Sequence, residues 1–445
     1  MAPDHRHPSI RRTMQTLFSH CTLFAGPGAP LIQNAFLATS DSLISDMGPM
    51  SSLPDLPGAR VIDCGGKLLM PGLINGHNHC AMTLFRGLAD DLNLSEWLQD
   101  HIFPAEKRHV SREMVYWSTR LAVAEMLLSG TTCVADGYFF SSEAARAIRD
   151  CGMRAVIGHG VVDFPAPSVP DPKKNIETVA GFIEEWQGAD PLITPAVFAH
   201  APYTCSPQTL KKAKELAARR GVPFFTHLAE SSRESAMIID LQADSPLRHL
   251  AALDLLDRNT VLIHAIWLDN EDLDLLAASG ARVVTCPQSN LKLASGIARI
   301  PELLARGVKV GLGTDGCASN NALDMFREMD LFAKLHKLTS LDATALPARE
   351  AMRAATTANA ELLGLPGLGY LAVGTIADLI LLDLEAPHLT PFYNPDLLVY
   401  AARGSDVHST MIGGRMVVEN GRILSFDLAE TMARVREIAA QLGAK

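Results

Sequence analysis

Residues 68–79 read LLMPGLINGHNH, an apolar run that Pro71 and Gly72 interrupt and that ends in two histidines one residue apart. In a β-strand the side chains alternate between the two faces, so His77 and His79 would lie on the same face. Two imidazoles at the end of a buried strand supply half of the ligands of a divalent metal site. A pair of surface-loop histidines is the alternative, but here an apolar strand precedes the pair and further candidate ligands occur later in the chain.

Apolar runs that read as strands recur through the middle of the chain and alternate with helical stretches. These runs lie at residues 132–136, 154–162, 193–199, 223–228, 260–266, 282–286 and 308–313. Between them, residues 207–220 and 270–279 have the three-to-four-residue apolar spacing of helices, and Ser206 with Pro207 makes a good helix start. With the strand that ends at His77, the pattern predicts eight βα units, and therefore an α/β fold of the (β/α)8 TIM-barrel type.

The two ends of the chain differ from this alternating middle. Short apolar runs separated by Gly, Pro, Asn and Asp fill residues 15–63, and residues 378–384 and 409–419 again read as strands. We therefore expect a small β-sandwich domain built from both termini. The expected boundaries are residues 15–70 with 366–445 for the β-sandwich domain and residues 71–365 for the metal-dependent barrel.

The composition excludes several classes of function. The chain has 445 residues, of which 48% are apolar and 20% charged, and its formal net charge is −10. An acidic surface disfavours nucleic acid and anionic membrane as partners, and no apolar run is long enough to span a membrane. The eight cysteines contain no C-x-x-C pair, so we expect reduced, buried thiols in a cytoplasmic enzyme. Arg11 and Arg12 precede an apolar run that is too short and polar for a signal peptide, so a frayed leader before a first strand is expected.

Polar residues stand where successive strands end. His200 comes directly after the fourth strand, His264 ends the sixth and Asp315 comes after the eighth, while His227 ends the fifth and precedes Glu230 by three residues. Catalytic side chains of such barrels sit at the carboxyl ends of the strands. One histidine on an apolar strand is more often a buried structural residue than a ligand. Five histidines and two carboxylates at the same end of successive strands indicate a functional site.

His77, His79, His227 and Asp315 make a ligand set of three nitrogens and one oxygen with room for a water. This set suits Zn²⁺, with Fe²⁺ as the alternative, and we expect one divalent metal per chain because the fourth strand offers no lysine for a bridge to a second metal. The metal would lower the pKa of its bound water and make a hydroxide nucleophile.

Three residues would assist this nucleophile. Asp315 can accept the proton of the water as well as bind the metal, and His264 can hold the hydroxide in place. Glu230 is placed to carry a proton to a substrate nitrogen as a general acid and base. The alternative for Glu230 is a solvated loop carboxylate.

From about residue 20 onward, the chain resembles the amidohydrolase superfamily, and within it the branch of 5′-methylthioadenosine/S-adenosylhomocysteine deaminases and chlorohydrolases. The resemblance rests on these motifs: residues 71–75 (PGLIN), 82–106 (MTLFRGLADDLNLSEWLQDHIFPAE), 200–206 (HAPYTCS), 226–230 (THLAE), 286–295 (CPQSNLKLAS) and 313–329 (GTDGCASNNALDMFREM). Together these motifs are specific for the branch and less specific for the substrate.

The resemblance implies a hydrolase that acts on the C–N bond of a cyclic amidine. The expected reaction is deamination of 5′-methylthioadenosine, adenosine or S-adenosylhomocysteine to the inosine analogue and ammonia. By matching position, Glu106 would bind the ribose hydroxyls, His200 would contact the base or the sugar, and the pair Ser289 and Asn290 would shape the pocket. Several members of the branch carry an arginine at the end of the third strand, where this chain has His159. A histidine there is a weaker partner for a substrate carboxylate, which disfavours S-adenosylhomocysteine as the best substrate.

Two other functions remain open. An aminohydrolase or chlorohydrolase for a guanine-like, pterin or s-triazine ring would use the same metal ligands, although a free ring has no ribose for Glu106 to hold. A non-catalytic binding protein on the same barrel would normally have lost metal ligands, and here the set is complete. In either enzymatic case the partner is a small molecule, and we expect a homo-oligomer.

Overall fold

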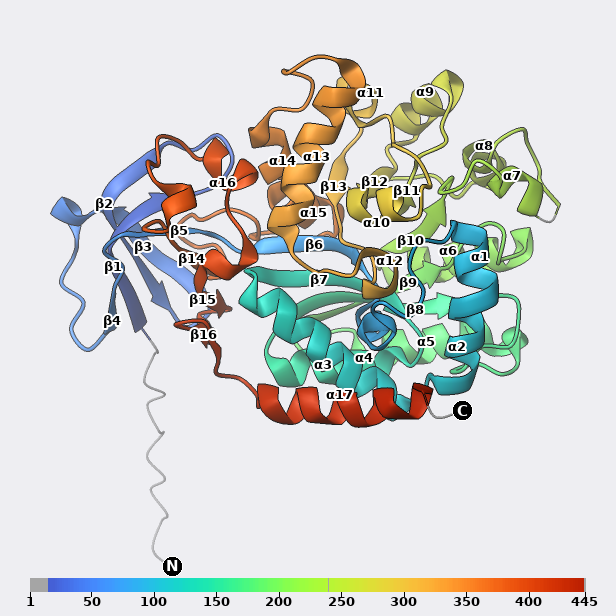
Figure 1. The fold of residues 1–445 in the computed structure, drawn as a ribbon, viewed down its shortest axis with the longest axis horizontal. Helices are drawn as coiled ribbons and strands as arrows, with labels where there is room; N and C mark the ends of the chain where they lie inside the picture. Colours follow the sequence, from blue (N-terminus) through green and yellow to red (C-terminus); the bar gives the residue numbers. More distant parts are fainter. Residues whose placement is uncertain (1–14, 239, 444–445) are drawn as a thin grey trace, which may run out of the picture.

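A computed structural model describes residues 15–238 and 240–443 (Figure 1). Their strands form two sheets, an eight-stranded parallel sheet that curves into a nearly closed barrel and a nine-stranded mixed sheet. The predicted TIM barrel with a small β domain from both termini is therefore confirmed. The basic leader lies outside the described residues, and the first strand is β1 (Gln15–Phe24).

Each of the eight barrel strands overlaps a strand expected from the apolar runs. They are β6 (Leu73–Asn78), β7 (Thr131–Tyr138), β8 (Arg154–Val161), β9 (Ile193–Ala199), β10 (Phe224–Leu228), β11 (Thr260–His264), β12 (Arg282–Thr285) and β13 (Val310–Leu312). Nearly every strand residue is buried, because helices cover the outside of the barrel and side chains fill its interior. This burial on both faces explains why the strands read as continuous apolar runs.

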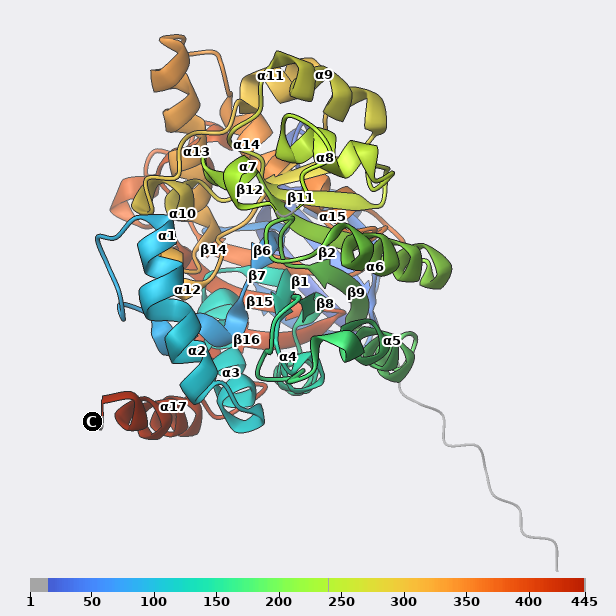
Figure 2. The same cartoon turned by 90° about the vertical axis from the view of Figure 1, so that its right-hand side faces the viewer.

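Helices surround the strands, as the view along the barrel shows (Figure 2). α6 (Pro207–Arg220) and α9 (Asn270–Ser279) have the predicted bounds. Ser206 begins α6 by accepting a hydrogen bond from the backbone N–H of Thr209, and Gly221 ends it with a φ of 66°. The other barrel helices are α3 (Arg112–Leu128), α4 (Ser141–Cys151), α5 (Asn175–Trp186), α8 (Pro246–Ala252), α11 (Ile300–Ala305), α13 (Met325–Ser340), α14 (Ala348–Ala354) and α15 (Thr357–Leu362).

The seam of the barrel lies between β6 and β13, the two ends of its hydrogen-bonded ladder. Asn359 of α15 bridges this seam, because its Nδ2 donates to the carbonyl oxygens of Ile74 and Leu312, each at 2.7 Å. A Cβ on Gly76 would lie 2.6 Å from Asn359 Oδ1, and a Cβ on Gly311 would lie 1.9 Å from the same atom. The two glycines therefore leave the space in which the amide closes the barrel.

The small sheet interleaves strands from both ends of the chain. Besides β1 it contains β2 (Leu31–Ser40), β3 (Leu43–Pro49), β4 (Arg60–Asp63), β5 (Lys67–Pro71), β14 (Leu379–Asp383), β15 (Val407–Ile412), β16 (Arg415–Glu419) and β17 (Arg422–Ile423). β5 pairs with β14, which joins the two ends of the chain. The sheet curls over its own core, so that the segment around β3 meets the residues that precede β14. There the Ile44 N–H donates to Thr375 O and the Ala377 N–H donates to Ser42 O, each at 2.9 Å.

Several contacts attach the ends of the chain to the barrel, and two of them are ion pairs. Arg154, at the start of β8, forms a buried ion pair with Asp378, which directly precedes β14. The C-terminal helix α17 (Leu428–Gly443) lies along α3 (Figure 1), where Arg434 pairs with Glu113 at 2.6 Å. The exact domain boundaries remain a prediction.

Three expectations concern the molecule as a whole. The eight cysteines are buried free thiols, as expected. None of the described helices combines the length and hydropathy that a membrane crossing requires. The expected homo-oligomer and cytoplasmic location remain predictions.

Candidate active site

A cavity of about 760 Å³ opens at the carboxyl ends of the barrel strands. Its floor contains most of the side chains predicted for the site, namely His79, His200, His227, Glu230, His264 and Asp315. Its outer walls come from α1 (Leu94–Glu96), the π-helical turn η3 (Trp97–Ile102), α2 (Phe103–His109) and residues 164–170 of the Pro-rich loop after β8. The outer walls are largely apolar, with Trp97, Phe103 and Phe164 among their side chains.

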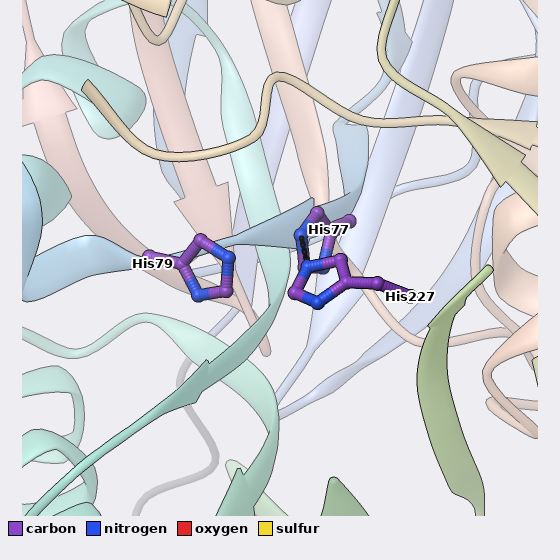
Figure 3. Close-up of side chains that lie close together, drawn as sticks. All are labelled: His77, His79 and His227. Carbon is purple, nitrogen blue, oxygen red and sulfur yellow. Dashed lines mark hydrogen bonds between the residues drawn. The ribbon is translucent and has the colours of Figure 1, made fainter. Parts of the chain in front are cut away.

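Three of the predicted ligands lie close together, and two of them, His79 and His227, line the cavity (Figure 3). The ligand atoms of His77, His79 and His227 all lie within 4.8 Å of one another, and all three residues are buried. The Nε2 atoms of His77 and His227 are 3.2 Å apart. His77 Nε2 and His79 Nε2 each lie 3.4 Å from Asp315 Oδ1. The four predicted ligands therefore converge, although they come from β6 and the residue directly after it, from β10 and from the turn after β13.

The hydrogen bonds of two of these histidines fit a metal site. His79 Nδ1 bonds to the carbonyl oxygen of Gly137, and His227 Nδ1 bonds to that of His200 at 2.8 Å. A carbonyl oxygen only accepts, so each Nδ1 carries the proton and each Nε2 keeps a lone pair for a metal. Burial lowers the pKa of His77 to about 4 and that of His227 well below its ordinary value, which favours the neutral, metal-binding form.

The surroundings of Asp315 favour its ionised form beside these histidines. Burial alone would raise its pKa, but the hydrogen bond with His77 and the neighbouring histidines hold the pKa of Asp315 well below its ordinary value. Its Oδ2 accepts hydrogen bonds from Ser289 Oγ at 2.7 Å and from Ser319 Oγ at 2.8 Å. The carboxylate is thus fixed in one orientation with Oδ1 towards the histidines.

Glu230 and His264 face each other beside this cluster. Glu230 Oε2 lies 3.7 Å from His264 Nε2, and both side chains line the cavity. His264 Nδ1 donates to Asn290 Oδ1 at 2.8 Å, which leaves Nε2 as an acceptor on the cavity side. Burial raises the pKa of Glu230, with His264 acting in the opposite direction. A carboxyl group with a raised pKa can hold a proton and release it, as general acid–base catalysis requires.

Glu106 and His200 line the cavity as predicted. Glu106 accepts a hydrogen bond from Tyr138 Oη at 2.6 Å, and burial raises the pKa of Glu106 to about 7. His200 Nδ1 lies 2.9 Å from Thr204 Oγ1. Both residues therefore present polar atoms to a molecule in the cavity.

Three predicted substrate contacts are placed differently. His159 does not line the cavity, because its Nδ1 lies 2.9 Å from Ser141 Oγ of α4, while its neighbour Gly160 does line it. The alternation of side chains along β8 accounts for this, since adjacent residues point to opposite faces. Ser289 and Asn290 also lie behind the cavity wall, where their hydrogen bonds hold Asp315 and His264.

Sequence reasoning missed several residues of the cavity. Tyr138 lies at the carboxyl end of β7, so a search for polar side chains at the end of the second apolar run could have found it. Lys107 adjoins Glu106 and is the only lysine or arginine among the described residues that line the cavity. The apolar outer wall had no local signal, because its residues come from short helical turns and one loop, which the strand pattern does not place.

Comparisons with known proteins agree with this geometry. The model of the Amidohydrolase family matches residues 68–417. A 5-methylthioadenosine/S-adenosylhomocysteine deaminase of Syntrophobacter fumaroxidans is 49% identical over 416 residues, which is 93% of each chain. A 5′-deoxyadenosine deaminase of Methanosarcina mazei is 38% identical and covers 94% of this chain and 96% of its own. The crystal structure of an adenosine deaminase from Xanthomonas campestris with bound zinc superposes with a TM-score of 0.93 at 35% identity, covering 96% and 98% of the two chains.

Proposed function

The chain belongs to the amidohydrolase family, and on this basis we propose that it is a metal-dependent hydrolase that deaminates an adenine nucleoside. The substrate would be 5′-methylthioadenosine, 5′-deoxyadenosine, adenosine or S-adenosylhomocysteine, and the products are the inosine analogue and ammonia. The observation that carries the proposal is the Glu230–His264 pair beside the three-histidine cluster, in a cavity that Glu106 also lines. The relatives with deaminase names support it at 38–49% identity.

His77, His79, His227 and Asp315 would hold one divalent metal, Zn²⁺ or Fe²⁺, which when bound supplies a water of lowered pKa as the nucleophile. The backbone carbonyls of Gly137 and His200 orient two of the imidazoles for this role. Ser289 and Ser319 orient the carboxylate of Asp315 in the same way.

Glu230 and His264 would handle the protons of the reaction. Water adds across the ring C6=N1 bond of the purine, with the oxygen on C6 and one proton on N1. The bond between C6 and the amino group then breaks, and the second proton of the water goes to the amine, which leaves as ammonia. Glu230 is buried and has a raised pKa, so it can deliver a proton to the substrate and recover one afterwards. The lone pair of His264 Nε2 can accept a hydrogen bond from the attacking water, and Asp315 can accept its proton.

Glu106 and the outer walls would select the nucleoside. The carboxylate of Glu106 can accept hydrogen bonds from the two ribose hydroxyls, and Tyr138 holds it in position. The apolar side chains of Trp97, Phe103 and Phe164 line the outer part of the cavity, where a 5′ substituent would extend. These surroundings favour a short apolar 5′ group.

Ammonia release tests the proposal. The purified protein is assayed against a panel of adenine nucleosides, free purines, pterins and s-triazines, with the Glu230→Gln variant as the inactive reference. We expect turnover of adenine nucleosides and slow turnover of adenine itself, because a free base cannot use Glu106. Turnover confined to free bases or triazines would contradict the proposal.

Metal analysis tests the ligand set. We expect about one transition metal per chain, because four ligands suffice for a single Zn²⁺ or Fe²⁺. Chelation should remove metal and activity together, and the chelated protein should regain both on addition of one equivalent of Zn²⁺ or Fe²⁺. Two metals per chain at full occupancy would be incompatible with this set.

A further inference from the structure

A third buried glutamate lies next to the site but, unlike Glu106 and Glu230, does not line the cavity. Glu234 begins the short helix α7 (Glu234–Met237) and is only 1% exposed. Its Oε1 accepts a hydrogen bond from the backbone N–H of Ala229 at 2.9 Å, and its Oε2 accepts one from the N–H of Glu230 at 3.0 Å. One carboxylate thus holds the two consecutive peptide N–H groups that lead into Glu230.

The turn held in this way is strained. Ala229 has a φ of +50°, in the left-handed region that residues with a Cβ rarely adopt. Its carbonyl oxygen accepts hydrogen bonds from Ile266 N at 3.1 Å and from Trp267 N at 3.0 Å, in the segment after β11. The peptide groups of Ala229 are therefore held from both sides, which is how a protein maintains a strained backbone at a functional site.

A further contact between the two turns holds the backbone at His264. His264 and Ala265 also have positive φ values, 73° and 47°, and the Ala265 N–H donates to Leu228 O at 3.0 Å. The turns after β10 and β11 therefore form one hydrogen-bonded unit. This unit places Glu230 Oε2 opposite His264 Nε2, at a distance of 3.7 Å.

We infer that Glu234 is a positioning residue, whose carboxylate holds the 229–230 turn and thereby fixes the Glu230 carboxyl opposite His264. The inference rests on the proposed function, because Glu230 is the group proposed there to transfer protons. Glu234 itself would touch no substrate. A purely structural role would stabilise the fold without affecting how each folded molecule turns over.

The experiment compares Glu234→Ala, Glu234→Gln and a matched control in the metal-loaded full-length protein. The control is Asp272→Asn, because Asp272 is also 1% exposed and accepts hydrogen bonds from the Asp269 N–H and from Ser245 Oγ, but it does not line the cavity. For Glu234→Ala we expect kcat to fall about 10–100-fold, since a small misplacement of a reacting group has effects of this size. KM and metal content should stay within about twofold. Glu234→Gln retains one hydrogen-bond acceptor, so its kcat should fall less than that of Glu234→Ala. The kcat of Asp272→Asn should equal that of the wild-type protein.

A double-mutant cycle separates positioning from stability. If Glu234 acts through Glu230, adding Glu234→Ala to Glu230→Gln should lower kcat by less than about twofold, because residues that act as a unit are not additive. An equal loss in both backgrounds, or a wild-type kcat in folded Glu234→Ala, would refute the inference. If Glu234→Ala does not fold, the same cycle is made with Glu234→Gln.

A crystal structure of the Glu234 variant gives a readout that needs no substrate. The 229–230 turn should shift and the distance from Glu230 to His264 should increase; an unchanged turn would refute the inference. If the wild-type protein deaminated no adenine nucleoside, the proposed function would fail, and the structure would still report whether Glu234 holds the turn.

Discussion

Single residues in this site differ in chemistry because their surroundings differ. Burial raises the pKa of Glu230, while the hydrogen bond with His77 and the nearby histidines keep the pKa of Asp315 low. Two carboxyl groups with pKa values moved in opposite directions can act as an acid and as a metal-binding base in the same cavity. The surroundings, not the residue types, assign these roles.

Substitution of Glu230 by glutamine tests the acid–base role. Glutamine keeps the shape of the side chain but cannot transfer the proton, so kcat should fall by about 10²–10⁴-fold. Metal content should be unchanged, because the proposed ligands are His77, His79, His227 and Asp315, and Glu230 is not one of them. Steady-state kinetics with metal analysis checks both values, and loss of the metal would identify Glu230 as a ligand.

Residues at the cavity mouth should decide the preferred 5′ group. Lys107 is exposed and supplies a single positive charge there, whereas tight binding of a carboxylate calls for a bidentate arginine. We therefore expect kcat/KM for 5′-methylthioadenosine or adenosine to exceed that for S-adenosylhomocysteine by at least ~10-fold, which is about 1.4 kcal/mol in transition-state binding. Assays of the substrates side by side at pH 7 decide this.

Lys107→Gln sharpens the same test. It should lower kcat/KM for S-adenosylhomocysteine by a further ~2–5-fold, the usual effect of an exposed ion pair, and leave 5′-methylthioadenosine unaffected. Lys173→Gln is the matched control, because Lys173 is exposed and does not line the cavity. Equal or reversed preference of the wild-type enzyme would mean that other residues bind the carboxylate.

At the scale of elements, the barrel depends on how its first and last strands meet. β6 carries His77 and β13 leads to Asp315, so the seam between these strands also aligns two of the predicted metal ligands. The Asp315 N–H donates to His77 O at 3.0 Å, which continues the seam into the site. Asn359 closes the part of the seam between Ile74 and Leu312. Closure of the barrel and assembly of the site are therefore coupled.

Substitution of Asn359 should destabilise this seam. Asn359→Asp keeps the size of the side chain but loses the donors, so the carbonyl oxygens of Ile74 and Leu312 would face a carboxylate. Each unsatisfied buried group costs about 1–3 kcal/mol, and we expect the free energy of unfolding to fall by at least that amount. Urea unfolding measures the change. Asn359→Ala loses the same hydrogen bonds without adding a charge, so it should be the milder variant; the opposite order would contradict this account of the seam.

At the scale of the whole molecule, one ion pair connects the barrel to the small sheet. Arg154 Nε and Nη2 donate to the two carboxylate oxygens of Asp378 at 2.9 and 3.2 Å, and both residues are buried. The Gly413 N–H donates to the same carboxylate at 2.7 Å. This arrangement ties the start of β8 to both the β14 and the β15–β16 parts of the small sheet.

Removal of one partner of this pair should cost more than removal of both. Arg154→Met leaves Asp378 buried without its counter-charge, which typically costs about 3–5 kcal/mol. The double variant Arg154→Met/Asp378→Leu should regain part of that loss, because it removes the isolated charge. Denaturant unfolding of the two single variants and the double variant checks this, and additive losses would show that the two side chains act independently.

The sequence by itself determined the fold class and most of the candidate site. The apolar runs located all eight barrel strands, because strands buried on both faces must be apolar throughout. The residues at their carboxyl ends, such as His227 and Asp315, then had to meet, since parallel strands end at the same side of a barrel. Helix α6 was predicted to the residue because its start and stop signals, Ser206 and Gly221, are local.

Only the tertiary structure decided which face and which neighbour each remaining residue has. His159 faces α4 instead of the cavity. The sequence did not predict this, because a strand that is apolar on both faces does not reveal which of its side chains point into the barrel. Ser289, Asn290 and Glu234 support reacting groups through contacts between separate loops. Such contacts depend on the relative positions of elements far apart in the chain, and no local pattern of residues encodes them.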